Sequence, residues 1–397
     1  MTENSKFWRG ALCGALVMLV IAAAGTAVWG FAESRNSNTD AADEDIQKKI
    51  KQIDSLISES YLYEDKIDSE KLREGQLSGY VDALEDPYSV YYDEEATNDL
   101  LESTEGEYSG IGAVLSQNTD TMLITLVTIY KGSPAEEAGL KDGDILYKVN
   151  GEDITTQTVT EVVTQIKGKE GSDVELTVLR GETKEEVTVT ATRRTIEVET
   201  VTWEMKENNI GYIKVTEFDK VTVDQYQTAL DELTAQGMEG LVVDLRSNPG
   251  GNLTTVCEML DLMLPKGTVV YTEDKNGERT TATSDEEHQF TKPMAVLVNQ
   301  YSASASEIYA GAIQDYKLGQ IVGTTTYGKG VVQQIFNLGD GTSLKLTISE
   351  YFTPNGRSIN GTGIKPDVEV EYEKNEADEE ADNQLDKAVE VVKGEID

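Results

Sequence analysis

The spacing of apolar residues changes twice along this chain, and these changes divide its 397 residues into regions of different secondary structure. Apolar residues recur at helical spacing from Ile46 to Tyr61 and again from Leu72 to Leu84, which predicts two helices. Residues 106–194 instead form short β-branched runs, which indicate strands. From residue 196 onward, buried strands alternate with helices, as in 240–245 followed by 253–264. This order predicts a multidomain α/β (α+β) protein.

The first apolar run, residues 10–31, carries no charge and is long enough to cross a membrane as a helix. Lys6 and Arg9 precede it and Glu33 follows it, so positive residues should keep 1–9 in the cytoplasm. A cleaved signal peptide usually has a shorter apolar region, which favours an uncleaved anchor. We therefore expect a single-pass plasma-membrane protein whose remaining domains are extracytoplasmic, after a linker at 32–44.

The formal net charge of −39 excludes nucleic acid as a partner, because the negatively charged protein and the phosphate backbone would repel each other. It favours cationic or neutral peptides. The chain has one histidine and two cysteines, too few for a zinc site of the usual kind, so no metal and no cofactor is expected. The apolar stripes of the helical region, 45–100, fit either a core face or a contact in a homodimer. The acidic segment 371–397 should end in an amphipathic helix.

Residues 105–195 resemble a PDZ domain. The resemblance rests on Ser133-Pro-Ala-Glu-Glu-Ala-Gly-Leu140 followed by Asp142-Gly-Asp-Ile145. Such a domain adds an extended peptide to a strand and holds the terminal carboxylate on backbone N–H groups. The matching loop would be Ser109, Gly110, Ile111 and Gly112. A tight turn is the simpler interpretation of its glycines.

Ser304 and Lys329 are the strongest candidates for catalysis. A serine nucleophile paired with a lysine base needs no histidine, whereas a Ser-His-Asp triad would have to use His288. Ser304 should begin a helix, where free N–H groups favour a developing oxyanion, although Ser304-Ala-Ser-Glu307 also reads as a plain capping box. Lys329, between two glycines, must be buried among apolar groups to lower its pKa, and Gln333 could orient its amine. A solvated loop lysine is the alternative.

The chain as a whole resembles the carboxyl-terminal processing (tail-specific) proteases, a family of PDZ-containing Ser/Lys serine peptidases. The motifs that carry the resemblance follow the family's order: Asp86-Pro-Tyr-Ser89, the PDZ block, Asp244-Leu-Arg-Ser-Asn-Pro-Gly-Gly251, Ser302-Ala-Ser-Ala-Ser-Glu-Ile308, Gly328-Lys-Gly-Val-Val-Gln333, Tyr351-Phe-Thr-Pro-Asn-Gly-Arg-Ser358 and Gly363-Ile-Lys-Pro-Asp367.

This resemblance implies a crotonase-like α/β protease core at 196–370, with the PDZ domain inserted before it. It assigns Ser304 as the nucleophile, Lys329 as the general base and Gln333 as the residue that orients the lysine. The oxyanion hole would be the N–H of Ala305 with that of Gly250 or Gly251. The expected substrates are proteins with a free C-terminus, and an activating partner is conceivable. Two alternatives stay open: a non-catalytic PDZ scaffold or chaperone, and an enzyme that uses His288.

Overall fold

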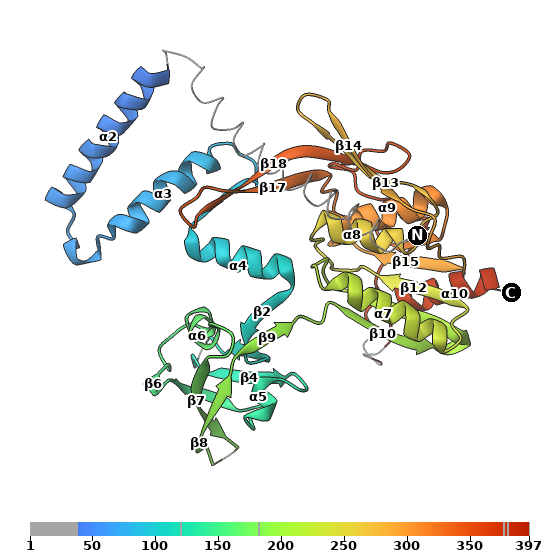
Figure 1. Cartoon of the computed structure of the whole chain (residues 1–397), viewed down its shortest axis with the longest axis horizontal. Helices are drawn as coiled ribbons and strands as arrows, with labels where there is room; N and C mark the ends of the chain where they lie inside the picture. The colour runs from blue at the N-terminus through green and yellow to red at the C-terminus, as the bar shows by residue number, and fades with distance from the viewer. Residues whose placement is uncertain (1–38, 120, 182, 376–377, 379–380, 397) are drawn as a thin grey trace, which may run out of the picture. The chain divides into compact units, whose positions relative to one another are not determined.

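A computed structural model describes residues 39–396 except 120, 182, 376–377 and 379–380 (Figure 1). The expected membrane span at 10–31 lies outside these residues. Among the described helices, none has the length and apolar character needed to cross a membrane. The chain divides into two compact units, Met1–Arg73 and Glu74–Asp397.

The first helices agree with the predicted spacing, but several of their apolar residues are exposed. Helix α2 runs over Thr39–Ser60, a short 3-10 turn η2 over Glu64–Lys66, and α3 over Ser69–Asp82. Ile53 and Leu56 of α2 are 49% and 62% exposed, and Leu77 of α3 is 48% exposed. Val81 of α3 is buried at 8% exposure, so the core-facing interpretation fits that residue but not these exposed ones.

The predicted strands of residues 105–195 form a small antiparallel domain. Its sheet has the order β3-β4-β5-β7-β8, with β6 paired to β5. The strands are β3 (Ala113–Gln117), β4 (Ile124–Ile129), β5 (Ile145–Val149), β6 (Glu152–Asp153), β7 (Asp173–Arg180) and β8 (Glu185–Thr192). Helices α5 (Pro134–Glu137) and α6 (Val159–Ile166) accompany the sheet. Leu126, Val162 and Leu176 are fully buried in its own core.

Helix α4 (Glu94–Glu105) and a two-stranded ribbon connect this domain with the rest of its unit. The ribbon pairs β2 (Glu107–Gly110) with β9 (Arg194–Glu197), so the domain is entered and left through adjacent antiparallel strands. Asp93 caps α4 by accepting the N–H of Ala96 at 2.8 Å.

The larger domain is built on a six-stranded sheet of order β10-β11-β12-β15-β16-β19. Its strands are β10 (Val201–Lys206), β11 (Ile210–Val215), β12 (Gly240–Asp244), β15 (Met294–Val298), β16 (Gln320–Gly323) and β19 (Val368–Glu369). Only β10 pairs antiparallel within this order; the other pairs are parallel. Between β10 and β11 lies the short turn η3 (Glu207–Asn209).

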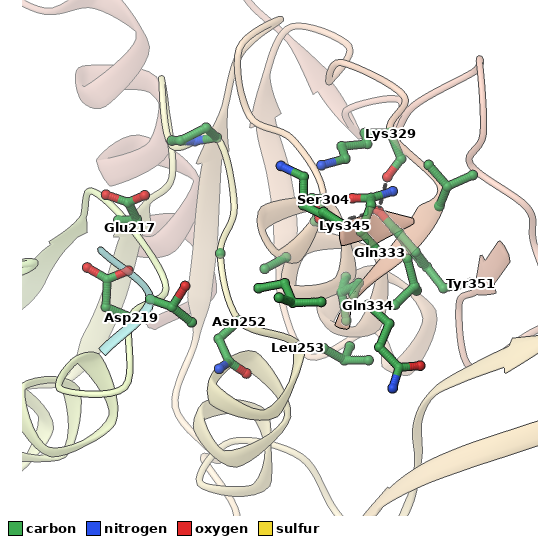
Figure 2. Close-up of a pocket in the computed structure, with 18 of the residues that line it drawn as sticks. Glu217, Asp219, Asn252, Leu253, Ser304, Lys329, Gln333, Gln334, Lys345 and Tyr351 are labelled. Carbon is green, nitrogen blue, oxygen red and sulfur yellow. Dashed lines mark hydrogen bonds between the residues drawn. The ribbon is translucent and has the colours of Figure 1, made fainter. Parts of the chain in front are cut away.

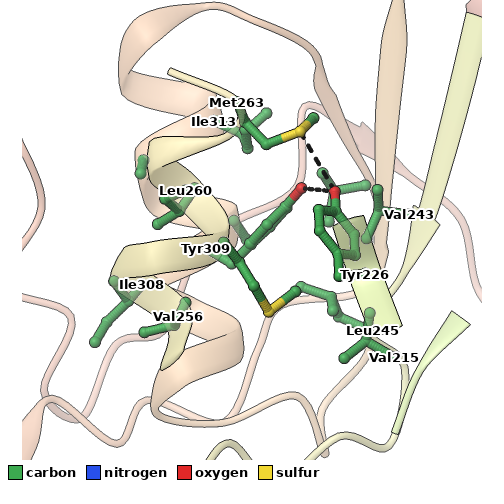
Figure 3. Packing of buried hydrophobic residues seen from close by; sticks show 14 of the residues in the cluster. Val215, Tyr226, Val243, Leu245, Val256, Leu260, Met263, Ile308, Tyr309 and Ile313 are labelled. Atoms are coloured by element: carbon green, nitrogen blue, oxygen red, sulfur yellow. Dashed lines mark hydrogen bonds between the residues drawn. The ribbon is translucent and has the colours of Figure 1, made fainter. Parts of the chain in front are cut away.

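Helices cover both faces of this sheet, which explains why its central strands are apolar throughout. Leu241 and Val243 of β12 face a core shared with α7 (Thr222–Ala235), α8 (Leu253–Asp261) and α9 (Ala305–Tyr316). Val242, which points the opposite way, packs with α10 (Asn383–Ile396), the predicted last helix. The hydroxyl groups of Tyr226 and Tyr309 form a hydrogen bond of 2.7 Å inside the core between the sheet and α7, α8 and α9 (Figure 3).

A second sheet lies beside α8 and α9 and has the order β1-β18-β13-β14, with β17 also paired to β18. Its strands are β1 (Val90–Tyr92), β13 (Gly267–Asp274), β14 (Arg279–Ser284), β17 (Val331–Asn337) and β18 (Ser343–Phe352). The pairing of β1 with β18 brings the Asp86-Pro-Tyr-Ser89 turn next to β17 and β18, although these strands lie far from the turn in the sequence.

Candidate active site

Ser304 occupies the position immediately before α9, as the sequence predicts. The preceding loop is held against the turn after β12: Ser302 donates its hydroxyl to the carbonyl of Leu245 at 2.7 Å, and the N–H of Ala303 bonds the carbonyl of Asn248 at 3.0 Å. Ser304 itself has φ 53° and ψ −112°, a conformation that glycine tolerates and other residues rarely adopt. Strained backbone of this kind is concentrated at functional sites.

Lys329 lies in the loop between β16 and β17. Its neighbour Gly330 leaves no room for a side chain, because a Cβ there would lie 2.5 Å from the backbone nitrogen of Asn360. Gly328 has φ +90° and is packed against the backbone of Gly361 and Thr362. The glycines therefore serve close backbone packing around the lysine, which fixes where its side chain starts.

The carboxylate of Glu307 joins the serine loop to the lysine loop. One oxygen accepts the N–H groups of Ser304 and Lys329, each at 2.9 Å. The other accepts the N–H of Gly328 at 2.7 Å and the hydroxyl of Thr326 at 2.5 Å. Glu307 is fully buried. The predicted capping interaction with the Ser304 N–H thus exists, but the same carboxylate also positions Lys329.

A second bridge reinforces the first. The hydroxyl of Tyr351, a residue of β18 that is 1% exposed, lies within hydrogen-bonding distance of two carbonyl groups. These are the carbonyl of Ser304, at 3.0 Å, and that of Lys329, at 2.5 Å. The backbones of both candidate catalytic residues are therefore tied to the same two buried side chains.

The surroundings of the Lys329 amine favour its neutral form. Burial lowers the pKa of Lys329, and the positive charge of Lys345 lowers it further, against the opposing effect of Asp86 and Glu307. The ammonium nitrogen lies 4.7 Å from the ring centre of Tyr88. The ring of Tyr88 and the carboxylate of Asp86 both belong to the Asp86-Pro-Tyr-Ser89 turn.

Ser304 and Lys329 line one cavity of about 590 Å³ (Figure 2). Gln333 lines it too, and its amide nitrogen donates to the hydroxyl of Thr347 at 3.3 Å. Apolar side chains complete part of the wall: Leu100, Leu253, Ile308, Val331, Val332, Ile335 and Ile348. The cavity can therefore accept an uncharged side chain beside a hydroxyl and an amine.

The two candidate oxyanion glycines differ in geometry. The N–H of Gly250 is engaged, because it donates to the side-chain oxygen of Asn248 at 2.8 Å. Gly251 lines the cavity together with Ser304 and Ala305, whereas Gly250 does not. Gly250 packs against the serine instead, since a Cβ there would lie 2.8 Å from that of Ser304.

Three family models match the chain. Peptidase family S41 matches residues 209–370, a PDZ domain matches 125–180, and the activating protease CtpB N-terminal domain matches 17–96. Carboxy-terminal processing protease CtpB of Bacillus subtilis (strain 168) is 37% identical over 326 residues, which are 81% of this chain and 67% of that protein. This chain belongs to the S41 family of serine peptidases, the carboxy-terminal processing proteases.

The chain is also similar to other proteases with related names. Carboxy-terminal processing protease CtpA of the same organism is 39% identical, over 78% of this chain and 66% of the relative. Among solved structures, a photosystem II D1 C-terminal processing protease is 29% identical with a TM-score of 0.46, and the match covers 79% of this chain and 85% of that one. The chain spans about two thirds of the length of the two Bacillus relatives.

The predicted carboxylate loop of the PDZ domain lies at the start of its free edge strand. Ser109 and Gly110 end β2, and Ile111 is buried in the domain core at 2% exposure. Gly112 has φ +73° and is crowded by Ser133, so both turn geometry and packing require glycine there. Strand β3 follows and pairs only with β4 in this sheet, which leaves its other edge open beside α6.

His288 lies in an exposed loop after β14, and it does not line the cavity that contains Ser304. The sequence predicts only a helix-capping role for Glu307 and no role for Tyr351 or Tyr88. All three residues belong to the family motifs quoted above, and this membership was the one available signal for them.

Proposed function

We propose that this chain is a membrane-anchored, extracytoplasmic serine endopeptidase that cleaves proteins with a Ser304/Lys329 dyad. The observation that carries the proposal is the shared cavity in which a half-buried lysine with a lowered pKa accompanies a strained serine at a helix start. A neutral lysine amine can act as a general base without histidine.

In this mechanism, the Lys329 amine takes the proton of the Ser304 hydroxyl as the oxygen attacks the substrate carbonyl carbon. The N–H groups of Ala305 and Gly251 stabilise the oxyanion; we choose Gly251 because the N–H of Gly250 is already engaged. The lysine then protonates the leaving amine. A water molecule, deprotonated by the same amine, hydrolyses the acyl-enzyme and restores the serine.

Gln333 has a supporting role in this proposal. Its amide nitrogen bonds Thr347, which leaves its carbonyl oxygen as the group that can accept a hydrogen bond from the lysine amine. Replacing Gln333 by Glu would place a negative charge beside the amine and raise the pKa of Lys329.

The PDZ domain would select substrates by their C-terminal tails. An extended tail would add to the open edge of β3, next to α6, and the backbone around Ser109, Gly110, Ile111 and Gly112 would hold its carboxylate. The exposed apolar stripes of α2 and α3 would contact a second copy or an activating protein. Residues 10–31 would anchor the chain in the plasma membrane.

The proposal is tested with the full chain, purified in detergent, beside its Ser304→Ala and Lys329→Ala variants. One unfolded substrate is made with a free and with an amidated C-terminus, and cleavage is followed by mass spectrometry. Cleavage by the wild type alone, faster with the free terminus, supports both dyad and tail recognition. Turnover by either variant contradicts the dyad. Tail binding without turnover by the wild type would instead indicate the scaffold alternative.

A further inference from the structure

Two carboxylates line the wall of the active-site cavity opposite the candidate dyad. Glu217 and Asp219, in the loop between β11 and α7, border the same cavity as Ser304 and Lys329. Figure 2 shows them on one side, with Ser304, Lys329 and Lys345 on the other. The dyad mechanism uses neither carboxylate.

The backbone fixes the position of this pair relative to the candidate oxyanion glycine. Phe218, which lies between the two acids, is fully buried. Its N–H donates to the carbonyl of Gly250 at 2.9 Å, and its own carbonyl accepts the N–H of Asn252 at 2.7 Å. Glu217 and Asp219 are therefore held in register with Gly251, so a substrate group that they bind would have a defined place relative to the scissile bond.

Asp219 is an unusual carboxylate because it is nearly buried and, among the residues that the structure describes, has no ion-pair partner. It is 5% exposed, and within the described part of the chain its carboxylate accepts no hydrogen bond. Its backbone, by contrast, bonds Thr222 through both N–H and C=O, each at 3.0 Å. The carboxylate is thus not used to cap α7.

Two lysines near the pair, one in sequence and one in the fold, already have partners. Lys220, the next residue in sequence, binds Glu105 at 2.7 Å. Lys167, which lines an adjoining cavity with Glu217 and Asp219, binds Glu102 at 2.6 Å. Burial, with a further effect of Glu217, raises the pKa of Asp219 to about 7. An uncompensated carboxylate in such a place disfavours folding unless a ligand uses it.

We infer that Glu217 and Asp219 form a subsite for a basic side chain of the substrate, a lysine or an arginine close to the scissile bond. This rests on the proposed function, since it concerns the same cavity. An ammonium or guanidinium group supplies several N–H donors and one positive charge, which match two carboxylates. The apolar wall near Leu253 and Ile308 would take an uncharged neighbour of that residue.

The experiment uses the full chain and a set of fluorogenic peptides with a free C-terminus. Each peptide carries Lys, Gln or Glu at one of the positions from three before to three after the scissile bond. The readout is the ratio of kcat/KM for the Lys and Gln peptides at each position. At one position we expect the wild type to prefer Lys by about tenfold, which corresponds to 1.4 kcal/mol.

Three variants separate the local effect from that of the net charge. Glu217→Gln/Asp219→Asn should bring the ratio at that position close to one, and the exposed single variant Glu217→Gln should lower it in part while keeping the fold. Glu239→Gln/Asp231→Asn removes the same charge from exposed sites outside the cavity and should leave the ratio unchanged.

The inference fails if the wild type shows no preference at any position, if the double variant keeps it, or if the control pair loses it equally. Failure of the proposed function has a different signature, namely no cleavage of any peptide. In that case, fluorescence anisotropy with the same Lys and Gln peptides makes the same comparison through binding. Equal affinity of the wild type for both would overturn the subsite.

Discussion

Replacing Glu307 by Gln tests whether one buried carboxylate holds together the two loops that carry Ser304 and Lys329. An amide keeps one acceptor oxygen and converts the other into an NH₂ donor. In the better orientation of the amide introduced at position 307, its oxygen still accepts the N–H groups of residues 304 and 329, and the hydroxyl of Thr326 can turn to accept a hydrogen bond from the new NH₂ group. The N–H of Gly328 then faces another donor and loses its bond. In the opposite orientation both Ser304 and Lys329 lose theirs.

A buried N–H without an acceptor costs about 1–3 kcal/mol, so one such group should lower the free energy of unfolding by about 1–3 kcal/mol and two by about 2–6 kcal/mol. Activity should fall about 100-fold, because displacement of a catalytic group by about 1 Å has that effect. The whole free energy of unfolding of a domain is only about 5–15 kcal/mol, so the loss is readily measured.

The assay is urea unfolding followed by tryptophan fluorescence, with peptide cleavage measured on the same samples. Of the three tryptophans, Trp8 and Trp29 are replaced by Phe, which leaves Trp203 in β10 as a reporter of the protease core. Asp315→Asn, at the other end of α9, is the control: its partner Arg357 is 43% exposed, so about 1 kcal/mol is expected with unchanged activity. A Glu307→Gln variant as stable and active as this control would refute the reasoning.

Three further outcomes follow from the site. Only the neutral amine of Lys329 can act as a base, and its pKa is lowered, so kcat/KM should rise with pH through a midpoint below 10.5. Lys345→Gln removes a like charge and should move this midpoint upward, whereas an unmoved midpoint in the pH profile would contradict the coupling. Gly330→Ala should reduce kcat/KM at least tenfold, because its Cβ meets the Asn360 backbone at 2.5 Å, and wild-type kinetics would show that the loop adjusts freely. His288→Ala should keep full activity in the same assay, and a large loss would revive a histidine mechanism.

The sequence predicts well those features that depend on neighbouring residues. The strand and helix on either side of Ser304 have strong apolar patterns, and the structure places β15 and α9 there. The β13–β14 hairpin was not predicted, because 279–284 contains one apolar residue and its register is set by pairing with β13 and, through it, β18.

The finer features of the site depend on contacts between distant segments. Local spacing indicates only a helix cap at Glu307, since its bonds to Gly328 and Lys329 come from another loop. The choice between Gly250 and Gly251 depends on the side chain of Asn248, whose orientation no pattern reveals. The position of Asp219 in the cavity likewise cannot be predicted from the sequence, because the other lining residues come from distant segments of the chain.

The backbone conformation of Ser304 is unfavourable for folding, although the serine side chain is the one that the proposed chemistry needs. A non-glycine residue in such a region costs about 1–3 kcal/mol, which glycine would largely recover. Selection for a folded chain alone would therefore favour glycine at this position, and under the proposed dyad mechanism selection for turnover retains the hydroxyl. A descendant of this chain that kept its PDZ domain but lost peptidase activity should drift first at residue 304, and would gain stability by doing so.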